Sequence, residues 1–180
     1  MSGVLLNGYL EFHYTSRASL LKLSKETFSK NNKSSWFLLR NFFFFIIQIV
    51  SNYSSALTTS DGLYTRPGGS SSSYYYEAVQ LVVDTTGTYD ISSVSGMDTL
   101  GYLYNGTFYP TNPSQNLIAQ NDDGAPNNQF KLPVHLIAGV PYTVVLSTHP
   151  SQLTGPFSIV TSGPGNAQYF PINTFETTSE

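Results

Sequence analysis

The stretch Phe130-Lys-Leu-Pro-Val-His-Leu136 places an apolar side chain at every second position. Successive side chains of a β-strand point to opposite faces of the sheet, so this alternation predicts a strand with one face in a core and one face in water. His135 falls on the polar face. Pro133 lacks the amide hydrogen that a strand ladder needs, so we expect this strand at a sheet edge or bulged at that residue.

Aromatic and β-branched runs of similar length recur on both sides of this stretch, at residues 74–84, 88–94, 100–104, 117–120, 142–148 and 157–161. Gly, Pro, Asn and Asp, the usual turn residues, separate them. No stretch after residue 57 keeps the 3.6-residue apolar period of an amphipathic helix. We therefore predict an all-β fold, an antiparallel β-sandwich of seven to eight strands.

The composition narrows the classes of function. The chain has 180 residues, of which 40% are hydrophobic and 11% are charged. That length corresponds to about one domain. The chain has no Cys and three His. This composition excludes a disulfide scaffold, a cysteine nucleophile and a zinc site built from Cys or from several His.

Charge is divided unevenly along the chain. Residues 1–50 carry six basic and two acidic residues, a net charge of +4, whereas residues 51–180 carry two basic and nine acidic residues, a net charge of −7. Binding to a phosphate backbone needs clustered Lys and Arg, so we expect no nucleic-acid partner for the acidic part. The two parts are expected to do different things.

The N-terminal part resembles a targeting or anchoring segment. An apolar block of 15 residues, from Trp36 to Val50, follows a basic stretch between Arg17 and Lys33. As a helix it would be about 22 Å long, shorter than the roughly 30 Å hydrocarbon core of a bilayer. Ser54-Ser55-Ala56 offers small residues for cleavage. Three alternatives stay open for this segment: an uncleaved anchor, a long signal, and an artefact of the gene model.

These observations divide the chain into three parts. Residues 1–56 form the basic and hydrophobic N-terminal segment, which we expect to be helical in its apolar block and to lie outside the sandwich. Residues 57–165 form the β-sandwich domain, and residues 166–180 form a polar tail without a strand pattern. We expect membrane contact only through the first part. The β domain would then be extracellular, either secreted or anchored at the cell surface.

Three segments, taken in order, resemble a known family. They contain Asp98-Thr-Leu-Gly-Tyr-Leu, Asn121-Asp-Asp-Gly124 and Ala138-Gly-Val-Pro-Tyr142. They are similar to the bacterial pre-peptidase C-terminal domain, whose pattern is an Asp before a Leu-Tyr-Leu strand, a strand that ends in an Asp-rich turn, and Ala-Gly-x-Tyr before a late strand. The likeness covers about residues 74–163. Thr99 and Gly101 depart from the Leu-Tyr-Leu strand.

The resemblance implies a β-sandwich of jelly-roll type that is appended, as a non-catalytic module, to secreted enzymes and surface proteins. Some members of the family bind calcium or collagen. Asp122 and Asp123 offer the hard oxygen ligands that calcium prefers. The family pattern places Asp98 before the neighbouring strand, where it could join them. Ca²⁺ is therefore a candidate cofactor, and no other cofactor is expected. The alternative is a plain turn, in which Asn and Asp bond their own backbone and Gly124 adopts a positive φ.

Short motifs suggest two further kinds of surface site. Asn105-Gly-Thr107 and Asn52-Tyr-Ser54 are N-glycosylation sequons, as is a third at Asn32, and Gly106 favours an exposed turn at the first. Tyr75 and Tyr109 are candidate contacts for a carbohydrate or protein ligand, because an exposed Tyr suits both. Core packing is the competing explanation for these tyrosines.

We expect no catalytic residue and no enzyme activity, since no Gly-x-Ser-x-Gly nucleophile motif accompanies His135 or His149. The sequence therefore predicts a non-catalytic extracellular or cell-surface module for adhesion, spacing or weak recognition of carbohydrate or protein. One alternative is the accessory C-terminal domain of a secreted hydrolase, a peptidase, whose catalytic part is absent. Another alternative is a gene-model fragment without function.

Overall fold

The computed structural model describes residues 3–6, 9–12, 48–70 and 74–172. The chain divides into two compact units, Met1–Phe45 and Ile46–Glu180. In the first unit, β1 (Gly3–Leu6) and β2 (Tyr9–Phe12) pair as an antiparallel hairpin. Most of the apolar block that we expected to be helical, residues 36–47, lies outside the described residues. Within the described ranges, no helix has the length and apolar character needed to cross a membrane.

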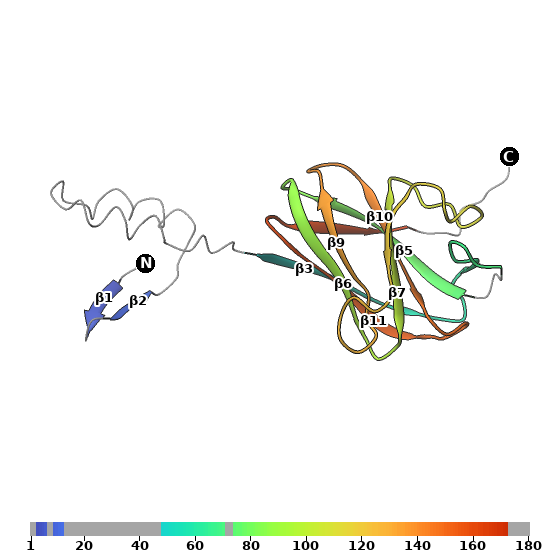
Figure 1. Ribbon diagram of the computed structural model, residues 1–180, viewed down its shortest axis with the longest axis horizontal. Coiled ribbons are helices and arrows are strands. Elements are labelled where there is room, and N and C mark those ends of the chain that lie inside the picture. Colours follow the sequence, from blue (N-terminus) through green and yellow to red (C-terminus); the bar gives the residue numbers. More distant parts are fainter. Residues whose placement is uncertain (1–2, 7–8, 13–47, 71–73, 173–180) are drawn as a thin grey trace. The chain divides into compact units, whose positions relative to one another are not determined.

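The second unit is an all-β sandwich of two antiparallel sheets (Figure 1). The four-stranded sheet has the order β3-β11-β6-β9 and is built from β3 (Ile49–Leu57), β6 (Gly87–Ser95), β9 (Lys131–Leu136) and β11 (Gly155–Gly163). The six-stranded sheet has the order β12-β5-β10-β7-β8, with β4 also beside β5. Its strands are β4 (Leu63–Tyr64), β5 (Tyr74–Val83), β7 (Thr99–Asn105), β8 (Leu117–Asn121), β10 (Tyr142–Thr148) and β12 (Ala167–Pro171).

The main core lies between the inner faces of the two sheets. Alternate residues of β6 and β9 are buried there, among them Tyr89, Ile91, Leu132 and Leu136, as the sequence predicted. Facing residues come from β5 and β10 of the other sheet. Pro133 is exposed on β9, and β9 is an edge strand, which confirms the expectation drawn from its missing amide.

A second apolar cluster covers the outer face of the six-stranded sheet. Tyr102 and Tyr104 share that face with Leu100, as predicted, but the face is buried rather than open to water. Tyr64 and Phe108 lie over it, with ring centroids 5.8 Å apart and nearly perpendicular planes. Edge-to-face aromatic contacts of this kind stabilise packing beyond the area that they bury.

Both expected boundaries of the sandwich are corrected. It begins at Ile49 rather than at residue 57, and a strand occupies Ala167–Pro171, where we expected a polar tail. Both missed strands lie at sheet edges, and β3 carries Ser and Ala at many positions, which hides the alternation. Ile49 and Val50, which end the apolar block, are therefore strand residues. The proposed cleavage triplet also lies in β3, paired with residues 156–158 of β11.

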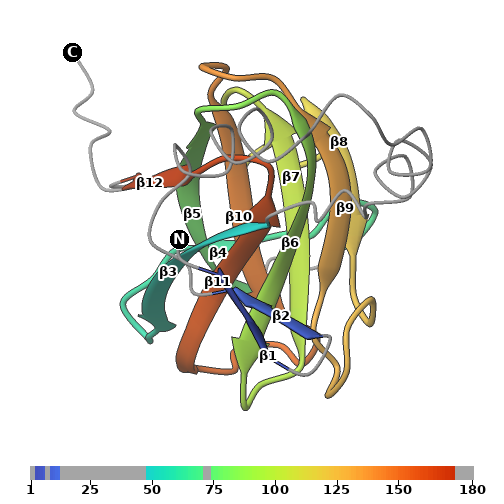
Figure 2. The ribbon, with the colours of Figure 1, turned by 90° about the vertical axis from the view of Figure 1, so that its left-hand side faces the viewer.

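The two sheets approach each other at both edges of the sandwich. β8 contacts β9 at one edge and β12 contacts β3 at the other, and Figure 2 shows both pairs. The strands β8 and β9 are joined by residues 122–130. This connection, together with the turn before β7, forms the candidate site.

Candidate functional site

Three carboxylates from two loops meet at one end of the sandwich. Asp98 ends the turn between β6 and β7, and Asp122 and Asp123 directly follow β8. Each offers a carboxylate oxygen, and these three oxygens lie within 4.8 Å of one another. The structure thus brings together all three residues that the sequence suggested for calcium, although 24 positions separate Asp98 from Asp122.

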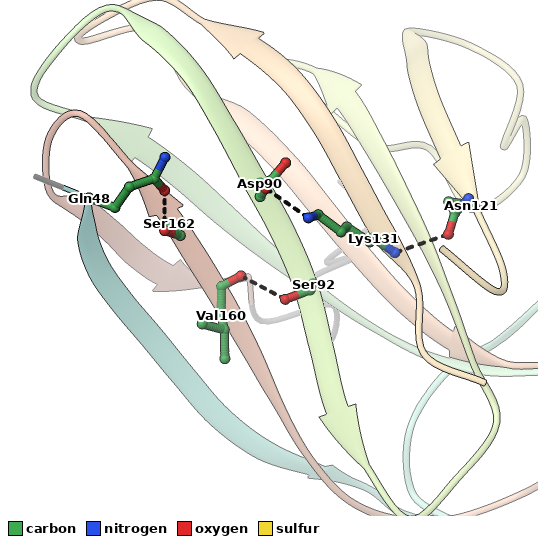
Figure 3. Close-up of polar contacts among 7 residues, drawn as sticks. All are labelled: Gln48, Asp90, Ser92, Asn121, Lys131, Val160 and Ser162. Atoms are coloured by element: carbon green, nitrogen blue, oxygen red, sulfur yellow. Dashed lines mark hydrogen bonds and ion pairs between the residues drawn. The ribbon is translucent and has the colours of Figure 1, made fainter. Parts of the chain in front are cut away.

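The side chain of Asn121 shapes the turn that carries two of these carboxylates. Its Oδ1 accepts hydrogen bonds from the amide of Gly124 at 2.7 Å and from the amide of Lys131 at 3.0 Å. The second bond links β8 to β9 (Figure 3). A Cβ at Gly124 would lie 2.4 Å from the same Oδ1, so only glycine fits.

The plain-turn alternative is correct about the bonding of Asn121 and wrong about the glycine. Gly124 is absent from the positive-φ residues, and its lack of a side chain is explained by the close approach of Asn121. The turn is thus a real Asn-capped turn. Capping by Asn121 leaves the carboxylates of Asp122 and Asp123 uninvolved, so the turn and a metal centre are compatible.

Gln129 holds the two loops together, and the sequence analysis missed it. The residue is buried, and its Nε2 donates to the carbonyl oxygens of Met97 at 2.7 Å, Asn127 at 3.0 Å and Asn128 at 3.1 Å. Met97 precedes Asp98, and the two Asn residues have positive φ angles of 63° and 56°. The signal in the sequence was the pair Asn127-Asn128 before Gln129. Asn adopts positive φ angles more readily than most residues, so the pair indicates a tight loop.

When all three carboxyls of the triad are ionised, their negative charges repel one another. The Oδ1 atoms of Asp98 and Asp122 are buried and have no hydrogen-bond partner among the residues that the structure describes. Burial raises the pKa of Asp122, and the negative charges of Asp123 and Asp98 raise it further, whereas His149 and Arg66 oppose the shift. A cation would satisfy the orphaned oxygens and neutralise the repulsion. The triad could therefore hold a metal.

The remaining candidate residues lie elsewhere on the sandwich. Tyr75 is half-buried and packs against the main core, so packing explains it. Tyr109, in the loop between β7 and β8, is 41% exposed. Asn105 and Asn52 are both exposed, the first beside Gly106 with its φ of 76° and the second in edge strand β3. His135 is exposed on β9.

No protein-family model and no curated protein matches the chain. The structure establishes an all-β domain of two sheets. No family match identifies that domain as a pre-peptidase C-terminal domain.

Proposed function

We propose that this protein is a non-catalytic recognition module displayed outside the cell, which uses calcium at Asp98, Asp122 and Asp123 to support weak binding of carbohydrate or protein surfaces. One observation carries the proposal. Two carboxylate oxygens are buried without a hydrogen-bond partner, and a third carboxylate lies within reach of the same point. A buried charge without a partner is unfavourable, and cation binding removes that cost.

The chemistry of the donor set favours calcium. Carboxylates are hard oxygen ligands, whereas zinc sites in proteins are usually built from Cys and His. Calcium takes six to eight oxygens. Three carboxylates leave positions for backbone oxygens, water or an oxygen of a bound partner. A site of this composition can therefore join structural support with ligand contact.

Surface features support an extracellular role. Asn105 is exposed next to a turn glycine, which is a suitable place for an N-linked glycan. The basic and apolar N-terminal segment would supply the route of secretion or the anchor. The outer face of the four-stranded sheet carries small polar side chains such as Ser54, Ser92 and Ser158, which suit a solvated passive surface. Adhesion and spacing require no chemically reactive side chain on this surface.

We also propose that the domain is related to the pre-peptidase C-terminal domain and shares its jelly-roll type. The resembling segments fall on β7, on the acidic turn that follows β8, and at the start of β10. This proposed relation supports a second candidate function, that of an accessory domain of a secreted peptidase. A protease signature in the same reading frame would decide for that function.

The full-length protein, with and without calcium, should be applied to glycan and extracellular-protein arrays. We expect retention that needs calcium, that Asp122→Asn abolishes, and that Tyr109→Ala weakens. Asp90→Asn is the matched control, because Asp90 is a partly exposed carboxylate that pairs with Lys131 at 2.8 Å, both within the four-stranded sheet. A blank array would reject recognition, and equal retention of the wild type with EDTA would reject the calcium support.

A further inference from the structure

A pocket of about 410 Å³ lies beside the triad, on the outer face of the six-stranded sheet. Its walls are residues 66–69 of the loop after β4, Leu100 and Tyr102 of β7, and residues 120–122 at the end of β8. This volume falls in the range of small-ligand sites. Asp122 lines the pocket and also belongs to the triad, so a ligand in the pocket would reach the metal centre.

The cation on one wall of the pocket is held in place, and no carboxylate of the described residues lies within ion-pair distance of it. The sandwich carries two basic residues, Arg66 and Lys131. Lys131 pairs with Asp90, whereas no ion pair of Arg66 occurs among the residues that the structure describes. The guanidinium carbon of Arg66 lies 3.6 Å from the centre of the Tyr74 ring. Stacking of this kind leaves the donors at the rim of the guanidinium plane available for an anion.

The loop that presents Arg66 is a tight turn. The amide of Gly69 donates to the carbonyl oxygen of Arg66 at 2.8 Å, and Gly68 between them has a φ of 75°. Pro67 before a glycine of positive φ is the signature of a type II turn. The turn and the Tyr74 ring thus fix the position of the cation before a ligand arrives, which lowers the entropy cost of binding.

The opposite wall has a different chemistry. Gln120 and Asn121 bring amide groups and Asp122 brings a carboxylate, so this wall can exchange hydrogen bonds with hydroxyl groups. Leu100 and Pro67 add apolar contact. A ligand that matches both walls carries one carboxylate for Arg66 and several hydroxyls on a compact ring. An acidic peptide would offer the carboxylate without the hydroxyls.

We propose that this pocket binds the carboxylated ring of an acidic saccharide, with the ligand carboxylate on Arg66 and its hydroxyls on residues 120–122. The inference rests on the proposed recognition function and names the class of sugar. A cation at the triad would offset the charge of Asp122 next to the anionic ligand. The test is therefore made with calcium present.

The experiment is an NMR titration of the ¹⁵N-labelled full-length protein with glucuronate and, as its neutral match, with glucose. We expect glucuronate to shift the amide signals of Leu100 and Gln120 and to bind more tightly than glucose. Arg66→Gln should weaken glucuronate binding by about tenfold or more, since it removes a charge-assisted bond. Lys131→Gln is the control, because it removes the other cation of the sandwich, whose side chain pairs with Asp90 and does not line the pocket.

A second variant guards against a folding defect in the first. Gln120→Glu adds a negative charge to the far wall and should weaken glucuronate binding more than glucose binding, because only glucuronate carries a like charge. Equal affinity of wild type and Arg66→Gln, equal affinity for glucose and glucuronate, or stronger binding of a glutamate-containing peptide would overturn the assignment. Array retention of neutral glycans that does not depend on Arg66 would defeat this inference and leave the recognition function standing. An array blank for every glycan and protein would defeat the recognition function itself.

Discussion

In the absence of calcium, Asp122 opposes folding at neutral pH. Burial and the neighbouring carboxylates raise its pKa in the folded protein. The folded state then binds the proton more tightly than the unfolded chain, so stability falls as pH rises through the unfolded-state pKa of about 3.9 towards the folded-state pKa. Above both values the ionised carboxylate carries its full cost.

Asp122→Asn should therefore raise the calcium-free melting temperature at pH 7, and the gain should shrink as pH falls and disappear well below the unfolded-state pKa of about 3.9, where the carboxyl is protonated in both states. Calorimetry in EDTA across this range measures the effect. Asp90→Asn is the control and should leave stability the same or slightly lower, because an exposed ion pair contributes about 0–1 kcal/mol. A variant less stable than the wild type at pH 7 would show that Asp122 is not strained.

Gly101 gives a prediction about packing. A Cβ at this position would lie 2.4 Å from two ring carbons of the fully buried Phe130. Gly101→Ala should lower the free energy of unfolding by about 1–3 kcal/mol, the usual cost of overfilling a core. Gly96→Ala is the matched control, since a Cβ there meets nothing within 4 Å. Urea unfolding of both variants decides, and equal stabilities would refute the packing argument.

Gly101 and Thr99, the two residues that differ from the Leu-Tyr-Leu pattern, each have a local structural role. Gly101 makes room for Phe130, and the hydroxyl of Thr99 shares a buried hydrogen bond of 2.6 Å with Ser93. Neither reason could be predicted from the sequence, because Ser93 lies in β6 and Phe130 directly precedes β9, and only the fold brings them to β7. The three Asp residues were predictable from their place in the motifs. Gln129 and Arg66 were not, because their roles arise only when separate loops meet.

At the scale of elements, strands with strong alternation were predicted within a few residues, and the edge strands β3 and β12 were missed. β9 and β10 show their apolar residues plainly, whereas the inward positions of β3 include Ser51 and Ser55. The order of the strands in each sheet was beyond sequence reasoning, since pairing depends on which turns and crossovers close first. The location of the triad at the edge shared by β8 and β9 follows from that order.

The role of β3 in the sandwich can be tested by truncation. A chain that begins at Thr58 lacks all of β3, including its last residue, Leu57, whose side chain is buried with 1% exposed. Loss of that one buried side chain costs about 1.5–3 kcal/mol, and the lost ladder with β11 adds to it. We expect a chain that begins at Gln48 to melt cooperatively and the shorter one to melt at a lower temperature or without a transition. Equal melting of the two chains would show that β3 is dispensable.

The pairing of β3 with β11 also affects where the N-terminus can be processed. Cleavage after Ala56 would remove nearly all of β3 from its partner β11. If the segment is a signal, we expect the mature N-terminus before Ile49 rather than at the triplet 54–56. Sequencing of the secreted protein locates it.

At the scale of the whole molecule, the proposed location outside the cell predicts a glycan on Asn105. This side chain is exposed at the end of β7. Expression of the full chain in a eukaryotic host should give a product whose mass falls on treatment with a peptide N-glycosidase, and Asn105→Gln should remove one glycan. A product without any N-glycan would argue against passage through the secretory route.

We propose that three carboxylates from two loops bind calcium and make this end of the sandwich a recognition site. A crystal structure of the protein grown with calcium tests it most directly. The claim predicts one strong density peak with oxygens of Asp98, Asp122 and Asp123 at about 2.3–2.6 Å from it. Ordered water at that point, with the carboxylates turned away from one another and no ion, would contradict it.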